Sequence, residues 1–184
     1  MPNDPRGSWS EVVREYELAV YGVPVRAGTT RSVAGRAHDR GLRLAAKRAL
    51  RHSPVRFDGV QAQAVARGFG EAAEEAGYRV AALAVLPDHA HVVMRWDRKD
   101  YKAIARHLKA KATQRLSAEG VHPMAGETGR GGRLPSPWAR GCWCPFIDSW
   151  DYFERAVKYV EENPVKAGLP RQRWEFVVGA GGRG

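Results

Sequence analysis

The feature that most constrains the fold is a nearly continuous apolar run at 78–96, with the sequence YRVAALAVLPDHAHVVMRW. An apolar run of this kind is typical of strands that are buried on both faces. Pro87 and Asp88 interrupt it near the middle, and both residue types favour turns. We therefore predict two adjacent strands, 79–86 and 89–96, that pair as an antiparallel hairpin.

Four other segments have the apolar periodicity of helices. They are 41–51, 58–77, 99–118 and 150–162. The second has Asp58 as its N-cap and Gly77 as a C-cap signal. The last is predicted to end at Asn163-Pro164, because proline does not readily continue a helix.

Two more strands are predicted outside the hairpin, at 15–26 and 141–149. The order is then strand, helix, helix, strand, strand, helix, strand, helix, which is an α+β pattern. We predict a ferredoxin-like antiparallel sheet with helices on one face. The expected organisation is a flexible N-terminal arm at 1–14, a single domain at 15–178 with a long loop at 120–140, and a disordered tail at 179–184.

The chain is basic, with 30 Lys and Arg against 20 Asp and Glu and a formal net charge of +10. Such an excess favours a polyanionic partner, because binding a nucleic acid releases counterions. Arginine enrichment from a GC-rich genome is an alternative explanation, and a solvated face explains the basic helix equally well. The candidate nucleic-acid contacts are Lys102, Arg106, Lys109 and Arg115 on that helix, and Trp138, whose ring could stack on a base.

The sequence predicts neither membrane insertion nor export. No apolar run reaches the roughly 18 residues that a membrane helix needs, and the first residues lack the apolar core of a signal peptide. Cys142 and Cys144 are the only two cysteines, too few for a disulfide framework. We expect a cytoplasmic protein that associates with the nucleoid.

His89 and His91 are separated by one residue in the second strand of the predicted hairpin. Alternate residues of a strand emerge on the same face, so the two imidazoles would lie a few ångströms apart. Such a pair is half of a site for a divalent metal ion. Taken alone, the motif is better explained by two structural histidines at the end of a strand.

Tyr159 and Asn163 lie one turn apart on one side of the last predicted helix. Tyrosine can act as a covalent nucleophile, and an asparagine oxygen can bind a metal ion. Taken alone, a core tyrosine before a helix-ending Asn-Pro is the better explanation. Tyr152 is a rival nucleophile with packing as its expected role, and two further histidines, His107 and His122, are expected to be structural or surface groups.

Together the two motifs resemble the HUH (His-hydrophobic-His) superfamily of single-strand nucleases. More narrowly, they resemble the single-tyrosine transposases of bacterial insertion sequences and the repeat-associated tyrosine transposases. The family's P-[N/D/E]-H-hydrophobic-H motif is matched by LPDHAH at 86–91, and its Y-hydrophobic-x-x-N-P-V-[K/R]-x-G motif by YVEENPVKAG at 159–168. A Trp-containing strand often lies between them, and 138–146 occupy that position. The resemblance covers 78–170.

This resemblance implies an HUH-type fold and metal-dependent cleavage and rejoining of single-stranded DNA next to hairpins. His89 and His91, with Asn163 as the third ligand, would hold Mg²⁺ or Mn²⁺. Tyr159 would attack the scissile phosphate to give a 5′-phosphotyrosine and a free 3′-hydroxyl, which can later reseal the strand. Family members occur as monomers and as dimers that exchange the tyrosine helix, and we expect a homodimer.

Three departures from the family concern DNA recognition and dimerisation more than chemistry. Ala90 is smaller than the usual residue between the histidines, two helices rather than one precede the hairpin, and the loop at 120–140 is long and Gly-rich. Two other functions stay open: a domesticated protein that binds DNA or RNA hairpins with little or no cleavage, and an unrelated metal-dependent H-x-H enzyme. Convergence of Tyr159 on the two histidines is the geometric criterion that separates the family from the unrelated enzyme.

Overall fold

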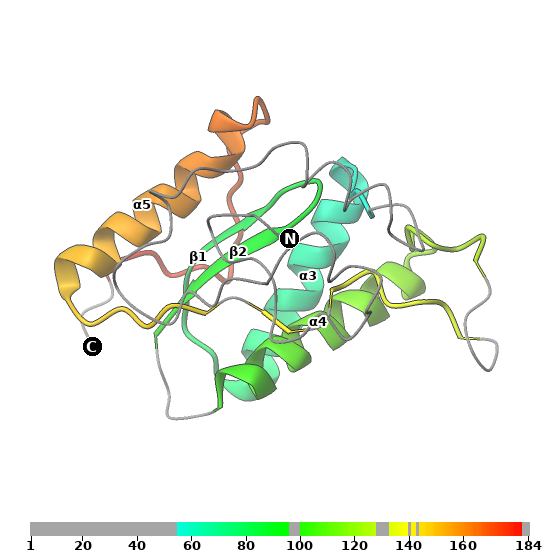
Figure 1. Ribbon diagram of the computed structural model, residues 1–184, viewed down its shortest axis with the longest axis horizontal. Coiled ribbons are helices and arrows are strands. Elements are labelled where there is room, and N and C mark those ends of the chain that lie inside the picture. Colours follow the sequence, from blue (N-terminus) through cyan, green and yellow to red (C-terminus); the bar gives the residue numbers. More distant parts are fainter. Residues whose placement is uncertain (1–54, 96–99, 128–132, 140, 143, 182–184) are drawn as a thin grey trace, which may run out of the picture. The chain divides into compact units, whose positions relative to one another are not determined.

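The computed structural model describes residues 55–95, 100–127, 133–139, 141–142 and 144–181. These residues contain α3 (Gly59–Ala76), β1 (Val80–Val85), β2 (Ala90–Met94), α4 (Tyr101–Ala118) and α5 (Trp150–Lys166) (Figure 1). The predicted α+β class is confirmed. All five elements belong to one compact unit, Val55–Trp138 with Ile147–Gly184. The predicted N-terminal arm, first strand and first helix lie outside the described residues.

The predicted hairpin is confirmed, with β1 and β2 paired antiparallel. Leu83 lies opposite Val92 and Ala84 lies opposite His91. The turn between the strands is closed by the amide of Leu86, which donates to the carbonyl of His89 at 2.8 Å. The strands are shorter than predicted by a few residues, since pairing rather than apolar character sets their ends.

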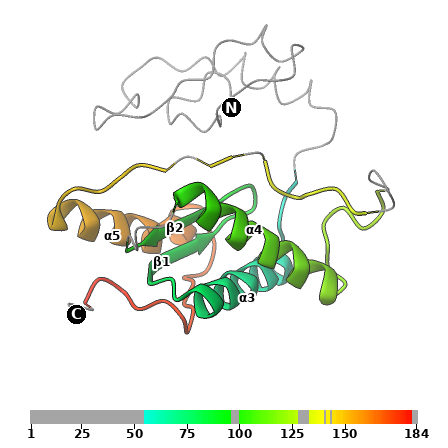
Figure 2. The same cartoon turned by 90° about the horizontal axis from the view of Figure 1, so that it is seen from below.

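Helices cover both faces of the hairpin, which corrects our expectation of helices on one face. Leu83 and Val85 of β1 pack with α3 and α4, whereas Ala82 and Ala84 pack with α5. The sheet therefore lies between α5 and the α3–α4 pair (Figure 2). All six residues of β1 are buried. A strand that is apolar at every position needs cover on both sides, because helices on one face would leave half its side chains in water.

The α3 and α4 helices pack closely because α3 has a glycine at their contact. A Cβ atom on Gly68 would lie 2.5 Å from the Cα of Ala112 on α4, so a larger residue does not fit there. The predicted apolar stripe of α4 is confirmed. Its buried members are Ile104, Leu108, Ala112 and Leu116.

Both predicted ends of α3 are confirmed. Asp58 and Gln61 form a capping box at its N-terminus, in which each side chain accepts a hydrogen bond from the other residue's amide. Gly77 ends the helix with a φ of 69°, a left-handed conformation that favours glycine. None of the described helices is both long enough and apolar enough to cross a membrane.

The prediction that α5 ends at Asn163-Pro164 is wrong, because the helix continues to Lys166. Proline has no N–H and removes one hydrogen bond from the helix. Pro164 is nonetheless one of the most deeply buried side chains among the described residues. Burial of its ring offsets the lost hydrogen bond, and sequence periodicity alone does not show this burial.

The predicted strand at 141–149 is also wrong for its described residues, none of which is in a strand. Gly141 has a φ of 72°, which interrupts extended backbone, and Pro145 has no N–H to donate to a neighbour. Phe146 is 64% exposed rather than buried in a sheet. The alternation of apolar residues in this segment therefore does not reflect a buried strand.

The C-terminal segment at 169–178 covers the edge of β1 that does not pair with β2. The side-chain amide of Gln172 donates to the carbonyl of Val85 at 2.7 Å and accepts from its N–H at 2.9 Å. The indole Nε1 of Trp174 donates to the carbonyl of Leu83 at 3.2 Å. Trp174, Phe176 and Val177 also pack on the α3–α4 core, so this segment folds back onto the domain.

Candidate active site

The register of the hairpin places the two histidines under α5. His91 lies opposite Ala84, and directly opposed residues of an antiparallel pair share a face. Ala84 and Val93 both belong to the cluster that packs against α5, so His91 emerges on that face. His89 lies two residues earlier and therefore emerges on the same side.

The two imidazoles point at each other. The Nε2 atoms of His89 and His91 are 3.1 Å apart, and the ring planes are inclined by 83°. The Nδ1 atom of His89 lies 2.7 Å from a carboxylate oxygen of Asp88. A carboxylate that accepts from Nδ1–H fixes the tautomer in which Nε2 carries the lone pair, the arrangement common for a metal-binding histidine.

Tyr159 projects from α5 toward this pair. Its ring lies edge-on to the His91 ring, with 5.8 Å between the centroids and an angle of 70°. Tyr159 is 47% exposed, so it is not a core tyrosine. The ammonium of Lys166 lies 5.7 Å from the Tyr159 ring centroid and is paired with Glu162 at 2.8 Å. A cation therefore stands next to the phenol.

Asn163 follows Tyr159 by one helical turn and lies on the same side of α5. Its Nδ2 atom is buried and has no hydrogen-bond partner among the described residues. A buried polar atom without a partner costs about 1–3 kcal/mol, so it calls for an explanation. Rotation of the amide by 180° puts an oxygen at this position, and a carbonyl oxygen is a ligand for hard divalent cations.

The residues at this site fit a divalent metal ion. Two nitrogens bound at about 2.1 Å in neighbouring octahedral positions lie about 3.0 Å apart, close to the observed 3.1 Å between the histidine Nε2 atoms. Two imidazoles and an amide suit Mn²⁺ better than Mg²⁺, which prefers oxygen ligands. No group of three or more His, Cys, Asp or Glu side chains in the described part of the chain could hold a metal ion, so a third protein ligand would have to be of another residue type.

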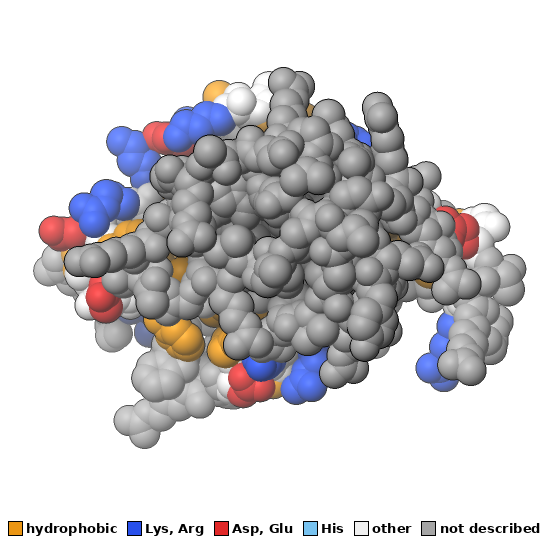
Figure 3. Space-filling model, viewed as in Figure 1, with side chains coloured by type: hydrophobic (Ala, Val, Ile, Leu, Met, Phe, Trp, Pro, Cys, Tyr) orange, Lys and Arg blue, Asp and Glu red, His pale blue; other side chains and the backbone are white. Residues whose placement is uncertain are grey.

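The basic residues of α4 lie away from this site, because α4 packs on α3 over the other face of the sheet. Arg115 is also paired with Glu71 of α3. Where described side chains are visible in Figure 3, Lys and Arg stand close to Asp and Glu rather than forming one broad positive patch. The structure therefore does not bring Lys102, Arg106, Lys109 and Arg115 to the histidine pair.

Trp138 is likewise not brought to the site. Its ring packs against Phe57 and Phe69 at centroid distances of 5.3 and 6.0 Å, and its Nε1 donates to the Thr113 hydroxyl at 3.1 Å. These contacts give Trp138 a packing role beside the α3–α4 core.

The other two described histidines have structural roles, as expected. His107 accepts or donates hydrogen bonds at both ring nitrogens, with Tyr78 at 3.2 Å and Glu75 at 3.2 Å. His122 is buried after α4, and its Nδ1 accepts from the amide of Met124 at 3.2 Å. Burial lowers the pKa of the His122 imidazole because it disfavours the charged form.

Two residues of the site were not assigned a role from the sequence. Asp88 was interpreted only as a turn residue and a matched motif position, and Lys166 only as a matched position in a motif. An acidic residue directly before a metal-type histidine, and a lysine two turns after a candidate nucleophile, are the signals that could have identified them.

The sequence matches no protein-family model and no curated protein, and the structure matches no solved structure. The function is therefore argued from the two motifs and the geometry that relates them.

Proposed function

We propose that this chain is a metal-dependent endonuclease and transposase of the HUH type, which cleaves and rejoins single-stranded DNA near hairpins through Tyr159. The observation that carries the proposal is the meeting of the two motifs. The 3.1 Å histidine pair at the end of the hairpin lies beside the ring of Tyr159, which comes from a helix 68 positions later than His91. An unrelated H-x-H enzyme would not require a tyrosine at this position.

In the cleavage step the Tyr159 oxygen attacks the scissile phosphorus and gives up its proton to solvent. A bond forms between the phenolic oxygen and phosphorus, and the bond from phosphorus to the 3′-oxygen breaks. The 3′-oxygen takes a proton and leaves as a hydroxyl, and the 5′-phosphate stays on Tyr159. The phosphodiester count is unchanged, so a 3′-hydroxyl can reverse the step without ATP.

His89, His91 and Asn163 are the residues that would hold the divalent ion. When bound, this ion would offset negative charge on the phosphate oxygens in the transition state. Asp88 orients His89 through the 2.7 Å contact. Lys166 places a positive charge beside the Tyr159 ring, where it could attract the phosphate of an approaching strand.

A covalent-trapping experiment tests the proposal. The substrate is a DNA hairpin flanked by randomised single-stranded arms and labelled at its 3′ end, because cleavage would leave the 3′ fragment on the protein. With Mn²⁺ the wild-type chain should give a labelled band that survives denaturing electrophoresis. Tyr159→Phe and His91→Ala should each lose it, whereas Tyr152→Phe should retain it.

Two outcomes would contradict parts of this proposal. An adduct formed by Tyr159→Phe but not by Tyr152→Phe would move the nucleophile to Tyr152. Hairpin binding without an adduct under any metal condition would favour the domesticated hairpin-binding function.

The same assay separates cleavage within one chain from cleavage in an exchanging dimer. Tyr159 and His91 meet within a single chain in the structure. A mixture of Tyr159→Phe and His91→Ala chains should then form no adduct. Restored adduct in the mixture would instead indicate a homodimer that exchanges α5, and light scattering would measure the oligomeric state directly.

A further inference from the structure

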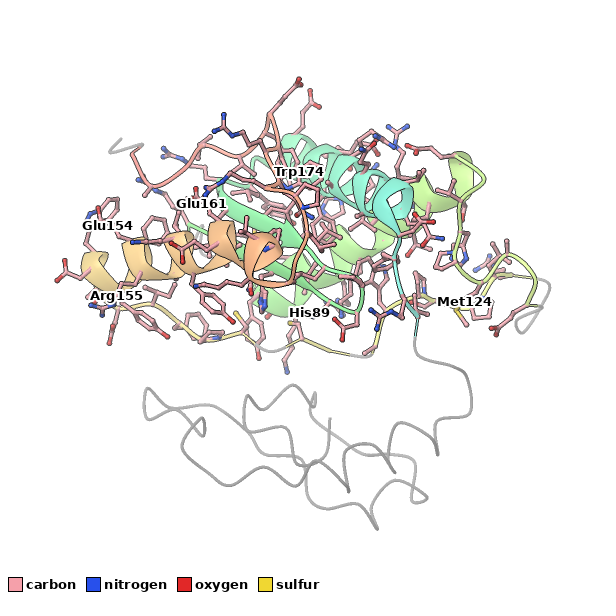
Figure 4. All side chains as sticks on the ribbon, turned by 90° about the horizontal axis from the view of Figure 1, so that it is seen from above. His89, Met124, Glu154, Arg155, Glu161 and Trp174 are labelled. Atoms are coloured by element: carbon pink, nitrogen blue, oxygen red, sulfur yellow. The ribbon has the colours of Figure 1, made fainter. Side chains whose placement is uncertain are left out.

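The two sides of α5 carry different kinds of side chain. Tyr152, Tyr159 and Lys166 are spaced by seven residues, about two turns, and so follow one side of the helix. Glu154 and Glu161 each come two positions after a tyrosine, about 200° around the helix. Figure 4 shows both glutamates on one side of α5 and Arg155 on the opposite side of the helix. The tyrosine side thus lacks these two carboxylates.

The acidic side of α5 has its own surroundings. A hollow of about 450 Å³ is lined by Glu154 and Glu161 together with Arg171 and Val157. Glu162, on the flank of the tyrosine side, is paired with Lys166 at 2.8 Å and with Lys158 at 4.0 Å. The pairing offsets its charge. This arrangement would let a phosphate backbone approach the tyrosine side of the helix with little repulsion.

Tyr152 and Arg155 form a pair on the tyrosine side, with the guanidinium carbon 5.9 Å from the ring centroid. Tyr152 is half-buried and Arg155 is exposed. An aromatic ring beside an arginine is the combination that single-strand binding surfaces use, because the ring stacks on a base and the cation attracts the backbone. Packing alone does not require the arginine.

We propose that Tyr152 and Arg155 form a stacking platform for an unpaired base of the single-stranded DNA that enters the active site. This inference rests on the proposed function and names where the strand lies. Tyr152 and Tyr159 are seven residues apart, about 10.5 Å along the helix. For a strand stacked as in duplex DNA, with about 3.4 Å per nucleotide, this separation corresponds to about three nucleotides between the stacked base and the phosphate that Tyr159 attacks.

Equilibrium binding tests the platform without cleavage. All variants carry Tyr159→Phe and are measured in EDTA by fluorescence anisotropy. The probes are a labelled oligothymidine of about 20 nucleotides and an abasic oligomer of the same length and charge. Tyr152→Ala should weaken oligothymidine binding about tenfold, whereas Tyr152→Phe, which keeps the ring, should stay within about twofold. Neither should change abasic-oligomer binding, because that probe has no base to stack.

Arg155→Gln provides a second variant at an exposed position, where misfolding is not expected. It should weaken binding of both probes and flatten the salt dependence, because a phosphate contact is lost. Equal oligothymidine binding with and without Tyr152→Ala, in the common Tyr159→Phe background, would overturn the platform. The platform would also be overturned if Tyr152→Ala weakened binding of the two probes equally. The adduct assay uses the chain with Tyr159 in place and measures covalent bond formation rather than affinity. Its result therefore tests the proposed function separately from the contribution of Tyr152 to DNA binding.

Discussion

Ala84 lies directly opposite His91 across the hairpin, on the face that α5 covers. Its side chain is fully buried, as are those of Ala81 and Ala82 in the same cluster. Small residues under a helix allow its backbone to approach the sheet closely. The reach of Tyr159 to His91 therefore depends on the size of residues that take no part in chemistry.

Replacing Ala84 with leucine should separate α5 from the sheet. Overpacking of this kind costs about 1–3 kcal/mol of unfolding free energy. We expect Ala84→Leu to lose most adduct formation under conditions where it is still folded, because Tyr159 moves away from the histidines. Urea unfolding and the trapping assay measure the two effects. Leu83→Met, on the α3 face of the same strand, is the control and should retain adduct formation.

Replacing Asp88 with asparagine should weaken metal binding. The carboxylate that holds His89 at 2.7 Å would become a neutral amide, which orients the ring less strongly. Loss of a partner of a metal-binding histidine typically lowers metal affinity about 10- to 100-fold. Calorimetric titration with Mn²⁺ measures this change. Asp148→Asn alters an exposed carboxylate elsewhere, and an equal loss in that control would remove the orienting role from Asp88.

Replacing Gly68 with alanine should destabilise the chain, although alanine usually favours a helix. The added Cβ would lie 2.5 Å from the Cα of Ala112, so α3 and α4 must separate, at about 1–3 kcal/mol. Gly59 lies in the same helix with nothing within 4 Å of an added Cβ. Gly59→Ala should therefore be neutral or stabilising by up to about 1 kcal/mol. Similar unfolding free energies for the two variants would contradict the close packing.

The buried His122 should make stability depend on pH. Burial lowers its pKa in the folded chain below the ordinary value of about 6.5 that it has when unfolded. Between these two pKa values the unfolded chain binds more protons, so stability falls as the pH drops below about 6.5. His122→Gln should reduce the difference in unfolding free energy between about pH 8 and about pH 5. An unchanged difference would exclude His122 as its source.

The hairpin and the three described helices were predictable from the sequence, because periodicity, caps and turn residues are local signals. The pairing of His89 with His91 followed from strand alternation in the same way. The side of the sheet that α5 covers could not be predicted in this way. It depends on which face of β1 each helix packs against, and local sequence signals do not specify that. Pro164 shows the same limit. A proline at this position predicts the end of a helix, but burial of its side chain allows the helix to continue.

The basic helix α4 illustrates why charge counted along one helix is a poor guide to a nucleic-acid-binding surface. The sequence of α4 shows its positive residues but not the residues that lie next to them in the fold. Glu71 and Glu75 of α3 pair with Arg115 and Lys111, respectively. Ion pairs between helices far apart in sequence cannot be read from one helix. The tyrosine side of α5 has fewer positive charges, but Lys166 lies beside the candidate nucleophile Tyr159 and Arg155 lies beside Tyr152.

The side chains of Gln172 and Trp174 occupy hydrogen-bonding groups along one edge of β1 without adding a regular strand. An uncovered edge of so apolar a strand would offer a template on which other chains could add strands. Cleavage of the backbone just after Gly168 would leave every proposed active-site residue in place and still expose this edge. We therefore expect the segment at 169–178 to protect the protein against aggregation, a role independent of the chemistry proposed at Tyr159.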